Sequence, residues 1–148
     1  MKKKLFAFVL ALFAASLFAC GNGERETIEF SLLPQNAKTF INTYFSDKQV
    51  AVVFHDKEVG DNDYEVVFTD SASIDFDKKG NWIEVEDRDV DGVPLAIFPE
   101  AIASYVNANH AGEHVVAISK DKRDYEVELS NNMDLVFDLD GNFLRYDD

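Results

Sequence analysis

The chain of 148 residues contains 28 acidic and 14 basic residues, which gives a formal net charge of −14 at pH 7. A field of that sign repels phosphate backbones, so it excludes nucleic acid as a partner and favours basic partners or divalent cations. The only cysteine, Cys20, has no second thiol to pair with, which excludes an intramolecular disulfide framework.

The first 20 residues have the pattern of an export signal. Three lysines at 2–4 precede an apolar run at 5–15 that is too short to span a membrane. The sequence LFAC at 17–20 resembles a bacterial lipobox, in which cleavage before Cys20 leaves a thiol that carries diacylglycerol. The alternative is an ordinary signal with a coincidental cysteine.

We therefore expect a signal peptide at 1–19, a lipidated Cys20 and a tether at 20–26. The lipoprotein would be attached to the periplasmic side of the cell envelope or to the outer membrane, through its acyl chains alone. Cleavage before Cys20 leaves 129 residues with 11 basic and 28 acidic side chains, a net charge of −17.

Two segments of the chain resemble each other at a constant offset of 61 residues. YEVVFTDSASIDFDKKGNWIEVED (64–87) lies over YEVELSNNMDLVFDLDGNFLRYDD (125–148), and 8 of the 24 positions are identical. The shared YEV and FDxxGN patterns predict that one structural unit is used twice.

A helix is expected at the start of each unit. LPQNAKTFINTYF (33–45) and FPEAIASYVNANH (98–110) place apolar residues at i, i+3 and i+4, which is the pattern of one helical face. Pro34 and Pro99 lie in the first turn, where a missing N–H costs nothing.

Four antiparallel strands are expected after each helix, because alternating residues are separated by glycine-containing turns. The sequence predicts one α+β domain at 27–148, made of two tandem helix-plus-four-strand repeats at 27–87 and 92–148. They would form a single antiparallel sheet with both helices on one face. The expected strands are 49–55, 64–69, 73–77 and 82–86, then 114–119, 125–130, 134–138 and 143–146.

The opposite face of that sheet is expected to be open and acidic, with a few apolar residues. Side chains alternate along strands, so the residues out of phase with the core point to this side. The expected residues are Glu65, Val67, Asp75, Trp82 and Glu84, then Glu126, Glu128, Val136, Phe143 and Arg145.

The lipobox, LPxxAxxFIxxYF in the first helix, GVPLAIFPEAIASYV at the second and the paired YEV and FDxxGN segments together resemble the beta-lactamase-inhibitor-like, PepSY-like family of secreted bacterial proteins. The resemblance covers about Ile28 to Asp148. It implies an inhibitor-like α+β fold outside the cytoplasm, with no established catalytic role and no active-site residues.

An acidic stretch, DRDVDGVPLAIF (87–98), begins like a calcium-binding loop of the DxDxDG type. Asp87, Asp89 and Asp91 would be ligands, but the twelfth position is Phe98 in place of the bidentate glutamate. The alternative is an exposed connection between the units, with Asp91 and Gly92 in its turn.

No catalytic constellation is expected from the sequence. HAGEH (110–114) matches the HxxEH sequence pattern of inverted zinc peptidases. However, Gly112 falls where the helix should end, so His110 and His114 would not share a helical face. We predict a protein without catalytic residues or a required cofactor.

The function expected is that of an envelope module that binds a protein or peptide through the open sheet face. The alternative is a calcium-responsive structural or buffering protein that uses the acidic connection. The expected partner-binding residues are Trp82, Glu84, Phe143, Arg145, Glu65 and Glu126.

Overall fold

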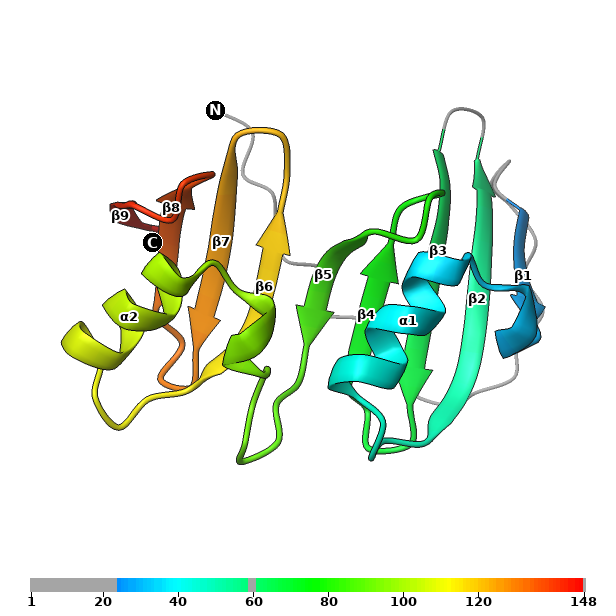
Figure 1. Cartoon of the computed structure of the whole chain (residues 1–148), viewed down its shortest axis with the longest axis horizontal. Coiled ribbons are helices and arrows are strands. Elements are labelled where there is room, and N and C mark those ends of the chain that lie inside the picture. Colours follow the sequence, from blue (N-terminus) through cyan, green and yellow to red (C-terminus); the bar gives the residue numbers. More distant parts are fainter. Residues whose placement is uncertain (1–23, 59–60, 148) are drawn as a thin grey trace.

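Nine strands form one antiparallel sheet in which every strand pairs with its neighbours along the chain, in the order β1 to β9 (Figure 1). The computed structural model describes residues 24–58 and 61–147. The predicted signal peptide and Cys20 lie outside these residues. The strands are β1 (Glu24–Ile28), β2 (Val50–Glu58), β3 (Asp61–Phe68), β4 (Ser73–Phe76), β5 (Trp82–Glu86), β6 (Val115–Lys120), β7 (Asp124–Leu129), β8 (Asp134–Asp138) and β9 (Phe143–Asp147).

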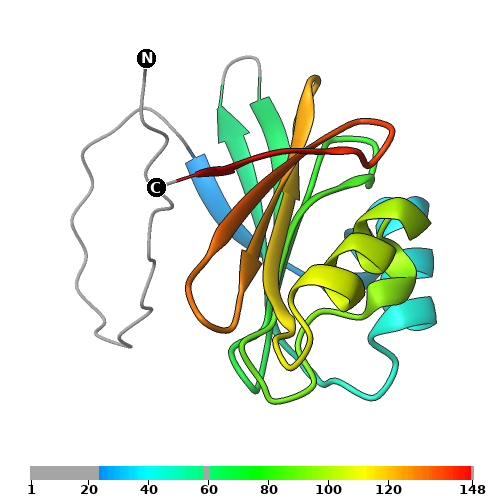
Figure 2. The ribbon, with the colours of Figure 1, turned by 90° about the vertical axis from the view of Figure 1, so that its left-hand side faces the viewer.

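Two α-helices, α1 (Gln35–Tyr44) and α2 (Glu100–Asn109), lie on the same side of the sheet (Figure 2). Pro34 and Pro99 are their N-caps, and each helix follows a short 3₁₀ turn, η1 (Phe30–Leu32) or η2 (Leu95–Ile97). The predicted α+β class and antiparallel sheet are confirmed. Within the described ranges, no helix is both long and apolar enough to cross a bilayer.

The core lies between the helices and the sheet as one cluster of buried side chains. It includes Ala37 and Ile41 of α1 and Ile102 and Val106 of α2. Residues of the central strands β5 and β6, among them Val85 and Ile118, belong to the same cluster. The helices therefore cover a single hydrophobic layer.

Strand β1 is a difference from the predicted architecture, in which residues 24–26 belong to the tether. The segment ERETI has charged residues where a buried strand would be apolar, so its sequence does not show strand periodicity. It pairs with β2 by opposite charge: Arg25 faces Asp56, with 3.5 Å between the Arg25 and Asp56 side chains, and Glu26 lies 2.6 Å from Lys57. Charged edge strands of this kind are common because they discourage further pairing.

Trp82 and Phe143 lie on the helix side of the sheet, so the prediction that they point to the open face is wrong. Trp82 has its ring centroid 6.3 Å from that of Phe40 on α1, and Phe143 stacks on Tyr105 of α2 with ring centroids 4.6 Å apart. The register shifts by one residue just after the β4–β5 turn, so that Trp82 pairs with buried Phe76, and the same shift after the β8–β9 turn pairs Phe143 with Phe137. A bulge of this kind moves a side chain to the other face.

The turns before Trp82 and Phe143 are built by an aspartate and a glycine. Asp77 accepts hydrogen bonds at Oδ1 from the backbone N–H groups of Lys79 and Asn81, and Gly80 takes the left-handed φ of 79°. Asp138 makes the equivalent bonds to Asp140 and Asn142 across Gly141, which has a φ of 85°. The carboxylates of Asp77 and Asp138 therefore hold the two turns together through hydrogen bonds to the backbone.

Candidate functional site

Four carboxylates lie in one row across the face of the sheet that the helices leave open. Strand pairing places Glu65 of β3 opposite Asp75 of β4, and Asp75 opposite Glu84 of β5. The row continues through Ser119 of β6 to Glu126 of β7. Val136 and Arg145 complete it on β8 and β9. Of the predicted partner-binding residues, Glu65, Glu84, Glu126 and Arg145 therefore share one row, while Trp82 and Phe143 lie behind the sheet.

Like charges directly opposite each other on a sheet repel, and the ionisation of this row reflects that repulsion. Burial, together with the charges of Glu65, Glu84 and Asp56, raises the pKa of Asp75 to about 7. Burial and the carboxylates of Glu86, Glu126 and Glu65 likewise raise the pKa of Glu84. The centre of the row therefore holds a carboxyl that is partly protonated at neutral pH.

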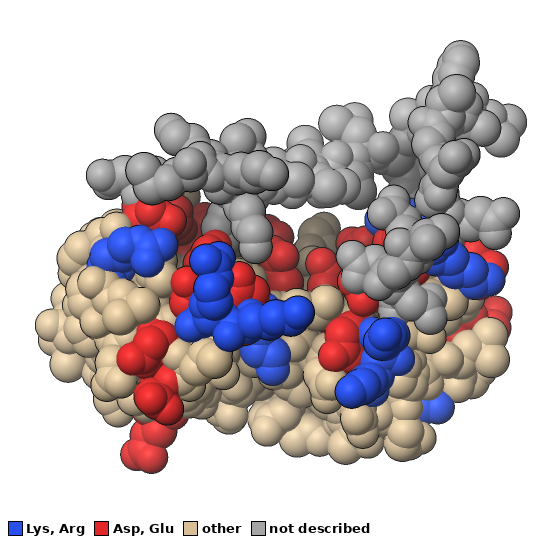
Figure 3. All heavy atoms as spheres, turned by 90° about the horizontal axis from the view of Figure 1, so that it is seen from above, with Lys and Arg blue, Asp and Glu red and all other residues tan. Residues whose placement is uncertain are grey.

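Basic side chains form ion pairs with carboxylates at the borders of the acidic face. At one border Arg25 pairs with Glu65 and Asp56. At another, Arg88 makes hydrogen bonds to both carboxylate oxygens of Glu128, at 3.0 and 2.8 Å. Among the residues the structure describes, Asp75 makes no side-chain hydrogen bond or ion pair. Figure 3, which looks onto one end of the sheet, shows basic and acidic residues packed side by side.

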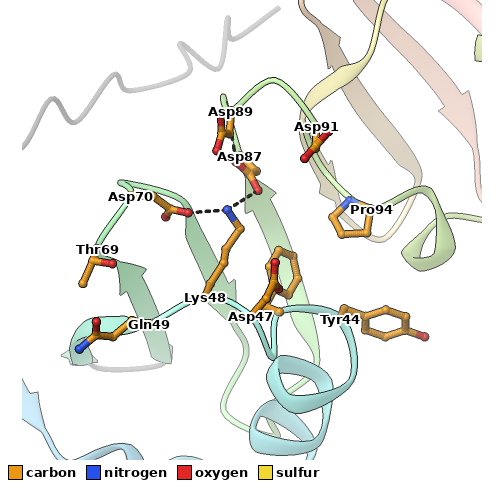
Figure 4. A pocket seen from close by; sticks show the side chains of 12 residues that line it. Tyr44, Asp47, Lys48, Gln49, Thr69, Asp70, Asp87, Asp89, Asp91 and Pro94 are labelled. Carbon is orange, nitrogen blue, oxygen red and sulfur yellow. Dashed lines mark hydrogen bonds and ion pairs between the residues drawn. The ribbon is translucent and has the colours of Figure 1, made fainter.

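A second charged site is a pocket between the end of α1 and the connection that follows β5. The ammonium group of Lys48 points between two carboxylates (Figure 4), with its Nζ 2.5 Å from Asp70 Oδ2 and 2.9 Å from Asp87 Oδ2. The side chain of Asp87 is only 6% exposed. The pocket has a volume of about 470 Å³, and Asp47, Asp89 and Asp91 also line it.

The three predicted calcium ligands, Asp87, Asp89 and Asp91, all line this pocket. Asp87 is paired with Lys48 and accepts the backbone N–H of Asp89 at 3.1 Å. Gly92, at a φ of 61°, donates its N–H to the carbonyl of Asp89 and closes the turn. In the described part of the chain, no group of three or more His, Cys, Asp or Glu side chains is arranged to hold a metal. A calcium site at Asp87, Asp89 and Asp91 stays a prediction.

Sequence reasoning missed Lys48. It follows α1 in an unremarkable polar segment, and its partner Asp87 is 39 positions further on, so no local pattern links the two.

Residues of the motif HAGEH (110–114) make contacts with residues in or next to strands of the sheet. The His110 ring contacts that of Tyr146, with centroids 5.9 Å apart, and Glu113 accepts a hydrogen bond from Ser130 at 2.5 Å.

Comparison with solved structures finds proteins of the same fold in Bacteroides. A "putative calcium-regulated periplasmic protein" from Bacteroides thetaiotaomicron is 43% identical, with a TM-score of 0.79, over 84% of this chain and 97% of that one. A "putative periplasmic protein from DUF2874 family" from Bacteroides vulgatus is 39% identical, with a TM-score of 0.79, over 86% and 100%. Another periplasmic protein of unknown function from Bacteroides vulgatus is 31% identical, with a TM-score of 0.78, over 84% and 100%.

None of the curated proteins matches the chain. The family model described as "Putative beta-lactamase-inhibitor-like, PepSY-like" matches residues 62–145, which run from β3 to β9. The resemblance predicted from the sequence is confirmed, and the chain belongs to the beta-lactamase-inhibitor-like, PepSY-like family.

Proposed function

We propose that the protein is a noncatalytic, lipid-anchored module of the cell envelope that binds a basic protein or peptide on its open sheet face. The observation that carries this proposal is the row Glu65, Asp75, Glu84, whose members lie directly opposite one another on β3, β4 and β5. A guanidinium or ammonium group placed over Asp75 would relieve the repulsion that raises the pKa of this carboxyl.

The arrangement supports binding better than catalysis. A catalytic carboxylate works with a second polar group held at a reacting atom in a cavity, whereas these carboxylates lie on a sheet surface. Among the described residues, the pocket lies away from this row, around Lys48. Charge complementarity on an open surface gives a partner specificity and a fast association rate.

The location rests on the N-terminal sequence and on the relatives. The pattern at 1–20 is that of a lipoprotein signal, and the three similar structures are described as periplasmic proteins. Lipidation of Cys20 would hold the domain at a membrane surface, on the periplasmic side of the cell envelope or at the outer membrane. Mass spectrometry of the protein extracted from membranes tests this, because a diacylglyceryl modification adds a defined mass at Cys20.

The same proposal includes an internal duplication of one helix-plus-four-strand unit. After α1 come four strands, and after α2 come four more. The glycine turns also agree, since Gly80 and Gly141 have nearly equal φ values of 79° and 85° and both precede a register shift. A duplication would explain how a domain of this size obtains a sheet wide enough to form an extended binding face.

The test of binding is affinity capture from envelope extract, with the signal removed and Cys20→Ser as bait. Glu65→Gln, Glu84→Gln and Glu126→Gln combined should abolish capture of the basic partner at physiological salt. A matched triple change of exposed acids elsewhere, Asp47→Asn, Glu100→Gln and Asp140→Asn, should leave capture intact, although it removes the same charge. Equal loss with both triples would reduce the effect to net charge and contradict a specific surface.

A calcium-responsive role is the second candidate, favoured by two observations. The relative from Bacteroides thetaiotaomicron is described as calcium-regulated, and five aspartates line the pocket around Lys48. Calcium would have to compete with the Lys48 ammonium for Asp87. Calorimetric titration decides: saturable heat that Asp89→Asn with Asp91→Asn removes supports the role, and no heat or melting shift at millimolar calcium ends it.

A further inference from the structure

Strand β9 is the last strand of the sheet, and it pairs with β8 along one edge only. Among the described residues, no strand pairs with its other edge. Two of its apolar side chains are exposed, Leu144 at 52% and Tyr146 at 48%. A free strand edge presents unpaired N–H and C=O groups that accept another strand.

The opposite edge of the sheet is different. Strand β1 carries Arg25 and Glu26, which are engaged with Asp56 and Lys57 of the neighbouring β2. Three of the five residues of β1 are charged, and charge on an edge strand discourages further pairing. Strand β9 has instead one basic and one acidic side chain two positions apart, Arg145 and Asp147, which are 52% and 57% exposed. Their own ion pair is long, at 3.7 Å.

The spacing of these two charges makes β9 complementary to itself. In an antiparallel pair of β9 strands centred on Tyr146, residues whose numbers are equally far from 146 lie opposite each other. Arg145 then faces Asp147 of the partner subunit, and Asp147 faces Arg145 of the partner subunit. Opposite charges directly across an antiparallel pair are stabilising, and aromatic residues across the pair add contact area.

We propose that the protein forms a symmetric dimer in which β9 of one copy pairs antiparallel with β9 of a second copy, centred on Tyr146. The alternation of side chains is consistent with this register. Arg145 and Asp147 are opposite Val136 and Asp134 of β8, on the open face, whereas Tyr146 is opposite the buried Leu135, on the helix side. A two-fold axis perpendicular to the sheet therefore brings like faces together.

The dimer also relieves a local excess of negative charge. Asp134 lies opposite Asp147, and burial, Glu128 and Asp147 together raise the pKa of Asp134. Arg145 of the partner subunit would approach Asp147 and offset this repulsion. Pairing joins the two sheets edge to edge, so that the acidic rows of both copies face the same way. This inference does not depend on the proposed binding function.

Disulfide trapping tests the register directly. Residues opposite each other in an antiparallel pair have Cα atoms about 4.5–5.5 Å apart, within the range that a disulfide bridges. In a Cys20→Ser background with the signal removed, Tyr146→Cys should give a covalent dimer under mild oxidation. Leu144→Cys is the matched control on the same strand, because the two cysteines would be about 14 Å apart in this register.

Val90→Cys is a second control, since Val90 is 81% exposed and lies far from β9 in the sequence. Charge reversal then tests the pairing. Adding Arg145→Asp or Asp147→Arg to Tyr146→Cys should slow cross-linking about three- to tenfold, because two like-charge pairs form. The double reversal should restore the original rate. Cross-linking at residues 144 or 90 as fast as at 146, or a double reversal no faster than the singles, would overturn the proposal.

Discussion

At the scale of single residues, the charges of this protein fall into two groups with different environments. Asp75 is surrounded by carboxylates and has a pKa raised to about 7. Asp87 is more deeply buried, but it has Lys48 as a partner. Burial of a charge is costly unless it is paired. The two aspartates therefore respond to substitution in opposite directions.

Asp75→Asn should stabilise the protein at pH 8 and have little effect at pH 4. The folded pKa of about 7 lies above the unfolded value of 3.8, so the native state binds the extra proton, and stability falls as pH rises between these values. Removing the carboxylate should recover about 1–2 kcal/mol at pH 8, after solvent screening.

Thermal melts of the wild type and the variant across pH 4 to 8 measure this effect. Asp140→Asn is the matched control, because Asp140 is exposed in the β8–β9 turn, outside the carboxylate row. A stabilisation by Asp75→Asn that is constant from pH 4 to pH 8 would contradict the ionisation argument.

Lys48→Met should destabilise the protein by about 3 kcal/mol at neutral pH, because it leaves the buried Asp87 carboxylate without its cation. Urea unfolding gives the free energy. Adding Asp87→Asn should recover part of the loss, since the uncompensated charge is then gone. Asp70→Asn, which removes the more exposed partner of Lys48, should cost less than 1 kcal/mol. Equal losses from Lys48→Met and Asp70→Asn would contradict this account.

At the scale of elements, the β4–β5 turn and the β8–β9 turn each contact the start of a helix. A Cβ added at Gly141 would lie 2.9 Å from Cβ of Ala101 on α2, and one at Gly80 would lie 2.8 Å from the backbone nitrogen of Ala37 on α1. The FDxxGN pattern therefore has two physical roles. Its glycine supplies the left-handed backbone of the turn, and it also lets the turn pack closely against the helix.

Gly141→Ala should destabilise the protein by more than Gly112→Ala. Both glycines have positive φ, 85° and 97°, so both substitutions strain the backbone by ~1 kcal/mol. Only Gly141 has a close neighbour, because a Cβ at Gly112 would meet nothing within 4 Å. Chemical denaturation of the two variants separates backbone strain from packing, and equal losses would show that the contact with Ala101 has no energetic role.

At the scale of the whole molecule, the two halves share one sheet and one core. Strand β5 pairs with β6 from Glu84 to Glu86, and both strands contribute to the same buried cluster. Small sheets with one helix are marginal alone because they bury too little apolar surface. We therefore expect the two halves to fold as one cooperative domain.

Residues 92–148 expressed alone should fail to fold, since β6 would become an unprotected edge and the contacts of Ile118 with the first half would be lost. The full domain should melt in a single transition, with circular dichroism and tryptophan fluorescence of Trp82 coinciding. A folded 92–148 fragment, or two separate transitions, would indicate independent halves.

Several features were predictable because they depend on residues close together in the chain. The helix period around Ala37 and Ile41 and the turn residues at Gly80 and Gly141 indicate their structures locally. Strand alternation also placed Glu65, Asp75, Glu84 and Glu126 on the correct face. The charged strand β1 was missed because its pairing with β2 comes from cross-strand ion pairs, which no local pattern reveals.

The sequence by itself determined the class, the antiparallel hairpins and the acidic character of one face, since period and turn chemistry are local properties. Only the tertiary structure decided which side Trp82 and Phe143 occupy, because a one-residue register shift reverses a side chain. It also decided the pairing of Lys48 with Asp87 and the order of the carboxylates across the sheet. These contacts join residues far apart in the chain, and they form only when the strands are hydrogen-bonded in one register.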